Sequence, residues 1–233
     1  QVPMTLPDKV RAAFPLDGLE GMMACVVTAD VFSTMDGYVE IFHEFVHCYQ
    51  FEECEIDLKR SLDVAVKAMA AKDCMWEINY PFPYQDPRVR DRYSALLKSV
   101  KEALKGVDIG AHEGEGEKGD RQSSSGSVSP KGSDYESVLE CRKSLGDTLD
   151  KHSIEYMVWQ EWKEGFARYI ENKIRAYLGL PLNLAGDLID DSSPFTRVSF
   201  YAGGAMLIGF LESVRPKAVR DLRLLFAELF SAL

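Results

Sequence analysis

The sequence is short of positive charge and of long apolar runs, and each shortage excludes a class of protein. Acidic residues outnumber basic ones by 37 to 27, which gives a formal net charge of −10 and a pI of about 5.0. A surface of that sign repels phosphate, so binding to nucleic acid or anionic lipid is not expected. The longest strongly apolar run, Ala205 to Leu211, is far below the roughly 20 residues that cross a bilayer, so membrane insertion is not expected either.

Cysteine and leader signals are also sparse. The chain begins at Gln1 with no basic stretch followed by an apolar one, so a signal peptide is either absent or already removed. The beginning of the chain therefore does not fix the compartment; a cytoplasmic location is favoured, with export after removal of a signal peptide as the alternative. The five cysteines form no CxxC pair and no dense framework, and we expect all of them to be reduced, partly buried thiols: Cys25, Cys48, Cys54, Cys74 and Cys141.

The 233 residues do show helical periodicity. With 46% apolar residues, the chain can form one large domain or two closely packed lobes. The best strand candidate is 23–27, and the proline-rich stretch 79–87 is expected to be a loop. The sequence thus predicts a mainly α fold with a small N-terminal β element. The expected helices are 35–51, 56–71, 87–105, 135–150, 153–178, 195–214 and 216–233.

The stretch HEFVHCYQ at 43–50 has the spacing of a metal site. His43 and His47 are four residues apart, so on a helix both imidazoles can reach one ion, and Glu44 is placed to act on water bound to that ion. The alternative is a pair of polar histidines on a helix surface. The other histidines compete poorly, because His112 lies in a Gly/Ser-rich stretch and His152 lies near the start of a helix.

A catalytic zinc site takes three protein ligands and keeps a fourth position for water. HEFVHCYQ, followed much later by EGFARYIE, resembles the gluzincin metallopeptidases, peptidase MA-like proteins whose two active-site helices read HExxHxxQ and EGxAxY. The resemblance covers two short motifs in the expected order. It implies a zincin-like architecture, with His43, His47 and Glu164 as zinc ligands and Glu44 as the general base.

Several residues near the second motif leave alternatives open. Glu161 lies three residues before the predicted third ligand, on the same helix face, and is a rival ligand. Relatives often carry an acidic residue where this chain has Arg168, which we expect to pair with Glu161 or Glu171, or to hold a substrate carboxylate. The small residues Gly165 and Ala167 are expected to let this helix pack close to the HExxH helix.

A third stretch, FYAGGAMLIGFLE, is similar to the downstream helix of these peptidases, in which a tyrosine faces the metal. The resemblance implies that Tyr201 donates a hydrogen bond to the oxyanion formed when water attacks a carbonyl. The alternative is a tyrosine buried in the core.

We therefore expect a zinc-dependent metallopeptidase that acts on a peptide or protein substrate. The expected parts are 1–105 with the HExxH helix, a flexible linker or loop at 106–134, and 135–233 with the third-ligand helix, together one catalytic domain. The stretch before His43, the first predicted ligand, is short for the sheet-bearing upper lobe of a zincin. This suggests a truncated chain or a reduced upper lobe. The main alternative is a catalytically inactive zincin-like binding or scaffolding protein; a hydrolase of non-peptide amides shares the same ligands. The sequence indicates neither the substrate preference nor the oligomeric state.

Overall fold

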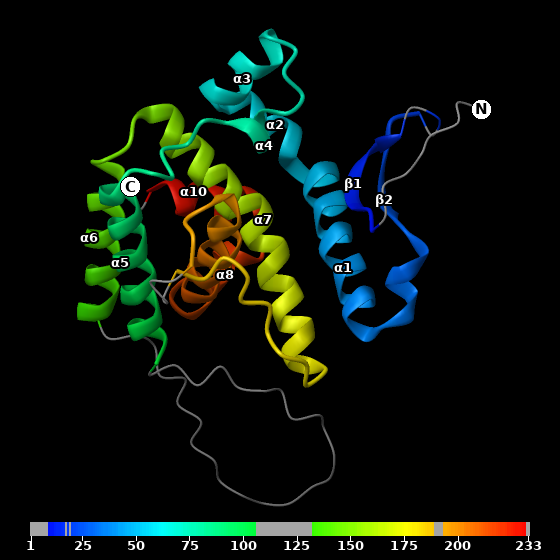
Figure 1. The fold of residues 1–233 in the computed structure, drawn as a ribbon. Helices are drawn as coiled ribbons and strands as arrows, with labels where there is room; N and C mark the ends of the chain where they lie inside the picture. Colours follow the sequence, from blue (N-terminus) through cyan, green and yellow to red (C-terminus); the bar gives the residue numbers. More distant parts are fainter. Residues whose placement is uncertain (1–8, 17, 19, 106–131, 189–192, 232–233) are drawn as a thin grey trace, which may run out of the picture.

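The computed structural model describes residues 9–16, 18, 20–105, 132–188 and 193–231. They form a mainly helical fold with a small antiparallel sheet near the N-terminus (Figure 1), which confirms the predicted mixture of helix and strand. The predicted linker lies almost wholly outside the described residues, so its flexibility and the predicted division into parts stay predictions. Across the described ranges, no helix is both long enough and apolar enough to cross a membrane.

A two-stranded hairpin opens the fold. Strand β1 (Arg11–Leu16) pairs antiparallel with β2 (Met22–Val27). β2 confirms the predicted strand, whereas β1 was not predicted because its sequence, RAAFPL, contains alanines and a proline that disfavour a strand. Both strands pack beside helix α1 (Met35–Gln50), and the Arg11 guanidinium donates to the Glu40 carboxylate at 2.7 Å.

Helix α1 matches its predicted range of 35–51 to within one residue. Thr34 caps its N-terminus by accepting from the backbone NH of Gly37, and the short helix η2 (Ala29–Ser33) precedes it. A Cβ on Gly37 would lie 2.1 Å from the Val31 carbonyl oxygen, so only glycine fits there. Beyond its last residue, α1 continues through a π-helical turn, η3 (Phe51–Glu55), into α2 (Ile56–Ser61) without a break.

The chain leaves the helix at Leu62, whose ψ of 122° is extended, and α3 (Asp63–Ala70) starts a new direction. The prediction of one helix over 56–71 is therefore wrong. In α3, Ala65 and Ala68 are buried, whereas Val66 and Met69 are 45% and 49% exposed.

The next elements frame the core. Helix α4 (Trp76–Asn79) leads into the predicted proline-rich loop, followed by α5 (Pro87–Leu104), which the Asp86 side chain caps. Phe82 in that loop is 5% exposed and packs against the rings of Tyr156, Phe195 and Phe200. Helix α6 (Gly132–Gly146) packs along α5.

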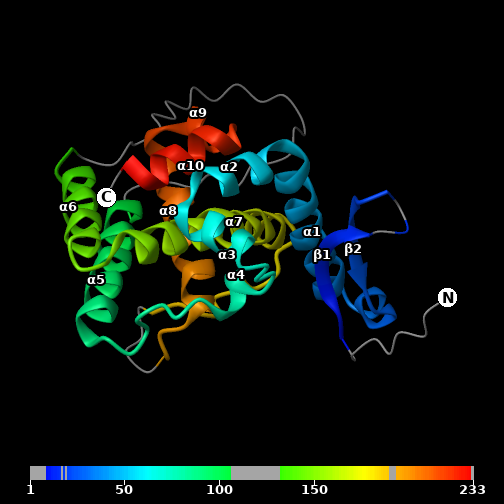
Figure 2. The same cartoon turned by 90° about the horizontal axis from the view of Figure 1, so that it is seen from above.

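Helix α7 (Lys151–Tyr177) runs through the centre of the molecule, with α1, α8 and α10 around it (Figure 2). Asp150 caps it by accepting from the NH groups of His152 and Ser153, so its predicted range is correct within two residues. Helix α8 (Arg197–Val214) also matches its prediction. The predicted helix 216–233 is instead two, α9 (Pro216–Val219) and α10 (Leu222–Ser231), because the Asp221 carboxylate caps a new helix.

Glycines set the contact between α7 and α8. A Cβ on Gly165 would lie 2.6 Å from the Cα of Gly204, and a Cβ on Gly204 would lie 2.5 Å from the Glu161 carbonyl oxygen. The expectation that Gly165 lets α7 approach the HExxH helix is therefore wrong, because this glycine faces α8. The close contact instead brings α8, with Tyr201, against the helix that carries Glu164.

Candidate metal centre

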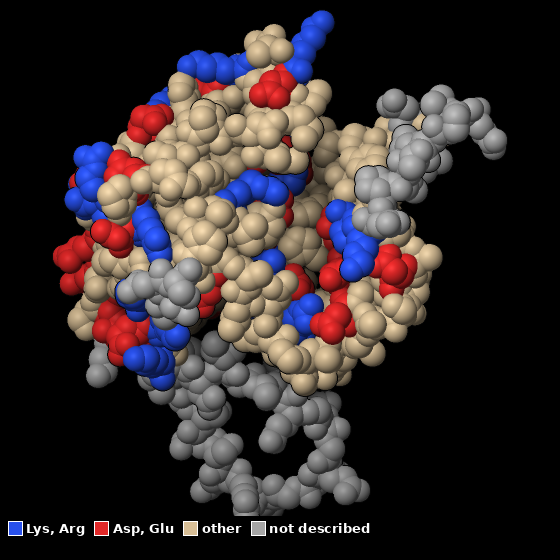
Figure 3. Space-filling model, viewed as in Figure 1, with Lys and Arg blue, Asp and Glu red and all other residues tan. Residues whose placement is uncertain are grey.

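Three side chains from two helices converge on one point. His43 and His47 project from α1 and Glu164 from α7, and one ligand atom of each lies within 4.8 Å of the others. The Glu164 Oε2 atom lies 3.8 Å from His43 Nε2 and 3.4 Å from His47 Nε2. The molecule is hollowed between the helical body and the part formed by α1 and the hairpin, with acidic and basic side chains in the hollow (Figure 3).

The cluster fits a metal ion in geometry and in donor chemistry. Ligands about 2.0–2.1 Å from a tetrahedral ion lie roughly 3.3 Å from one another, so small side-chain rotations would close these distances onto an ion. Two imidazole nitrogens and a carboxylate oxygen are a donor set that zinc accepts. The residues present therefore fit the group that the sequence motifs imply.

The remaining ring nitrogens of both histidines are already engaged. His47 Nδ1 lies 3.0 Å from Gln50 Oε1, and His43 Nδ1 lies 3.1 Å from Glu171 Oε2. Because both partners accept hydrogen bonds, this network assigns the proton to Nδ1 in each neutral ring and leaves the Nε2 lone pair for a metal. In its neutral form, each ring is thus held in the tautomer that a ligand needs.

Gln50 also joins the two helices that carry the cluster. Its amide nitrogen donates to the backbone oxygens of Trp162 and Lys163, at 3.1 and 3.2 Å, and its side chain is fully buried. This contact fixes α1 against the turn of α7 that ends at Glu164. The sequence motif contained Gln50, but its role becomes visible only when the two helices are placed together.

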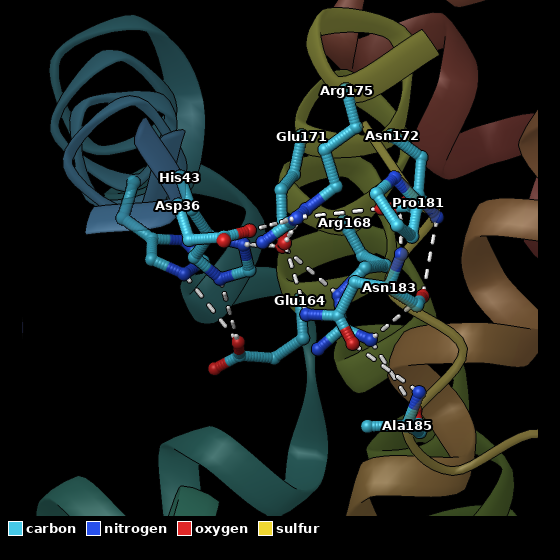
Figure 4. A network of polar contacts seen from close by, with 11 residues as sticks. Asp36, His43, Glu164, Arg168, Glu171, Asn172, Arg175, Pro181, Asn183 and Ala185 are labelled. Carbon is cyan, nitrogen blue, oxygen red and sulfur yellow. Dashed lines mark hydrogen bonds and ion pairs between the residues drawn. The ribbon is translucent and has the colours of Figure 1, made fainter. Parts of the chain in front are cut away.

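Glu171 is the centre of a polar network behind His43 (Figure 4). Its carboxylate accepts from His43, from Arg168 Nε at 3.0 Å, from Arg175 Nε at 2.9 Å and from Asn183 Nδ2 at 2.9 Å. Burial opposes the charge of this carboxylate, but the hydrogen bonds from His43, Asn183 and Arg175 outweigh it and lower its pKa to about 2. Glu171 is thus an anion that orients a candidate ligand.

Arg168 belongs to this network. It is 6% exposed, and besides Glu171 its guanidinium donates to the backbone oxygens of Asn183 and Ala185. The predicted pairing with Glu171 is confirmed and the pairing with Glu161 is wrong, whereas a contact with a substrate carboxylate stays a prediction. Glu171 lies seven residues after Glu164, two helical turns along the same face, which is the signal that could have assigned its role.

The rival ligand Glu161 points elsewhere. It is fully buried and forms a two-pronged ion pair with Arg142, at 2.7 and 2.5 Å. It therefore cannot serve as the third ligand. His152 also lies outside the cluster, with its Nε2 3.0 Å from Lys67 Nζ, and His112 lies outside the described residues. All five cysteines are free, as predicted, although Cys74 is exposed.

Glu44 sits in the electrostatic field of the cluster. It is partly buried, and burial raises the pKa of its carboxyl, while the nearby imidazoles of His47 and His43 act in the opposite direction and Glu164 adds to the increase. A carboxylate with a raised pKa holds a transferred proton more readily than an exposed glutamate does.

Two side chains of α8, Tyr201 and Arg197, also lie near the cluster. Burial and the neighbouring Glu164 charge raise the pKa of the Tyr201 hydroxyl. Arg197 Nη1 lies 3.8 Å from Glu164 Oε1, and its guanidinium lies 5.3 Å from the Tyr201 ring centroid. Tyr201 is only partly buried and faces the cluster rather than the core. Arg197 was not predicted; its place one turn before Tyr201 is the signal that could have found it.

No protein-family model, curated protein or solved structure matches the chain. The function is therefore inferred from the geometry of the cluster and the chemistry of its side chains.

Proposed function

We propose that the protein is a zinc-dependent metallopeptidase of the gluzincin type, with a zincin-like architecture. The observation that carries the proposal is the convergence of His43, His47 and Glu164, with the Nδ1 atoms of both imidazoles already hydrogen-bonded to acceptors. Histidines that bind a metal almost always donate their other ring NH to an acceptor, which is the arrangement that both imidazoles have here.

His43, His47 and Glu164 would hold the ion, and zinc bound there would supply a Lewis acid that lowers the pKa of a coordinated water to about 7. Glu44 takes the proton from the attacking water and returns it to the leaving amine. Tyr201 and Arg197 donate hydrogen bonds to the carbonyl oxygen of the substrate as negative charge develops on it.

The test separates the metal from the chemistry. The purified chain should contain one zinc per molecule by elemental analysis and should cleave members of a peptide library in a reaction that a chelator stops. Glu44→Gln should keep the zinc and lose turnover. Glu52→Gln, which changes an exposed glutamate on η3, should behave like the wild type.

The other outcomes favour the alternatives. Zinc bound without cleavage of any peptide favours the catalytically inactive scaffolding protein. Cleavage of small amides but of no peptide favours the non-peptide hydrolase. A chain that binds no zinc, or a Glu44→Gln variant that is fully active, contradicts the proposal.

A further inference from the structure

Helix α1 exposes a row of large apolar side chains on a face that does not carry the histidines. Each member is between 45% and 53% exposed, although the helix is otherwise packed against α7 and the hairpin. We call this row the outer stripe, and it consists of Met35, Tyr38, Phe42, Phe45 and Tyr49. Phe42 and Tyr49 would fit the apolar side of an amphipathic helix, yet they point outward.

The spacing of the outer stripe is three, four, three and four residues. This is the a and d pattern of a heptad, in which side chains of one helix insert between those of another helix that crosses at about 20°. A helix is therefore the shape that the stripe complements best. α1 also lies at the edge of the helical body, between α7 and the hairpin (Figures 1 and 2).

The area is sufficient for a stable contact. Phe32, which is 56% exposed, extends the patch because its ring contacts that of Tyr38 edge-on at 5.9 Å. With side chains of about 200 Å² each, roughly half exposed, these six residues present about 600 Å². That is the upper limit of the apolar patches found on monomers. Two such patches facing each other would bury about 1,200 Å², the lower limit of stable protein interfaces.

We propose that the outer stripe is the interface of a homodimer, in which α1 of one copy packs against α1 of a second copy. A twofold contact needs a surface that complements itself, and a heptad seam does so because each copy supplies the helix that the other lacks. None of the six side chains is charged, so two chains of net charge −10 do not place like charges at the centre of the contact. This inference does not depend on the proposed peptidase activity.

Dimerisation would leave the metal centre accessible. His43 and His47 face α7 rather than the outer stripe, so the second copy covers neither of them. The second copy would instead pack against another face of the helix that carries both histidines.

Sedimentation equilibrium of the full chain tests the proposal. Over about 1–100 µM the wild type should change from the 26.2 kDa monomer to a species of twice that mass. Phe42→Glu, at the middle of the stripe, should weaken the dimer by about thirtyfold or more, as expected for a residue at the centre of an interface. Tyr177→Glu, which alters an aromatic residue that is 84% exposed at the end of α7, is the matched control and should dimerise as the wild type does.

Circular dichroism shows whether Phe42→Glu is folded, and the wild-type measurement is decisive without that variant. A wild-type chain that remains a monomer up to about 100 µM overturns the proposal. Binding of a monomeric chain to vesicles of uncharged lipid also overturns it, in favour of a membrane surface. A folded Phe42→Glu variant that dimerises like the wild type shows that the interface lies elsewhere.

Discussion

The two candidate histidine ligands occupy equivalent places in the motif but different electrostatic environments. His47 Nδ1 meets the neutral amide of Gln50, whereas His43 Nδ1 meets the carboxylate of Glu171. The motif predicted which residues converge, because a spacing of four on a helix depends only on local geometry. Spacing along α7 and α8 places Glu171 and Arg197 on the same helix faces as Glu164 and Tyr201, but that these faces meet His43 and the cluster depends on how the helices pack.

The environment of His43 predicts a pH dependence of stability in the metal-free chain. Burial favours the neutral ring, but the nearby carboxylate of Glu164 and the hydrogen bond to Glu171 outweigh it and raise the pKa of His43 from 6.5 to about 9. Because the pKa of the folded state is the higher one, the charged ring stabilises the fold fully below pH 6.5, and this stabilisation is lost as the pH rises through 9.

Unfolding by urea in the presence of a chelator measures the effect. The wild type should be more stable than His43→Gln by about 2–3 kcal/mol at about pH 6, and this advantage should largely disappear at about pH 10. A wild-type advantage that grows between these two pH values would show that the ring is neutral in the folded chain.

A second prediction at this scale concerns Arg197. If its guanidinium donates to the developing oxyanion, Arg197→Met should lower kcat by about 10²–10³ while the zinc content stays unchanged. Arg197→Lys should recover part of the loss because it restores the charge. Lys173→Met removes a cation that pairs with Glu212 on the surface and serves as the control. An Arg197→Met variant with a raised KM and an unchanged kcat would assign this residue to substrate binding alone.

At the scale of elements, the features of the sequence that predicted helices correctly were local ones. Apolar periodicity located the starts of α1, α5 and α7 to within two residues. The errors lie where packing overrides local preference. The helical segment continues past 50 through a π-helical turn, and it ends at Leu62, which is 2% exposed and takes an extended conformation. No single-residue signal in the sequence marks either event.

The contact between α7 and α8 gives the prediction for this scale. Gly165→Ala would place a methyl group 2.6 Å from the Cα of Gly204, so the helices must separate, and stability should fall by about 1–3 kcal/mol. Gly209→Ala is the matched control, because a Cβ there meets nothing within 4 Å, and in α8 it should stabilise the chain by about 0.5–1 kcal/mol. Chemical denaturation compares the two variants. Equal effects would mean that the helices are not in contact at these glycines.

For the whole molecule, the candidate metal centre lies where parts distant in the sequence meet. α1 contributes two of its side chains and α7 the third, while α8 adds Tyr201 and Arg197. The ligands could be predicted because each motif is short and self-contained. Their convergence could not, since it depends on the Gln50 contact between α1 and α7 and on the glycines that bring α8 close.

A metal bound at this junction should therefore stabilise the fold as a whole. An ion that binds only the folded chain raises the free energy of unfolding by about 2.7 kcal/mol when its free concentration is a hundred times its Kd. Zinc added to the chelator-treated wild type should produce this increase in urea denaturation and raise Tm, whereas Glu164→Ala, which removes the ligand supplied by α7, should show little of it. His152→Ala is the control, because its imidazole lies outside the cluster, and it should respond to zinc as the wild type does. An equal response of Glu164→Ala and the wild type would place the zinc elsewhere in the chain, since the bridge between α1 and α7 cannot form without that carboxylate.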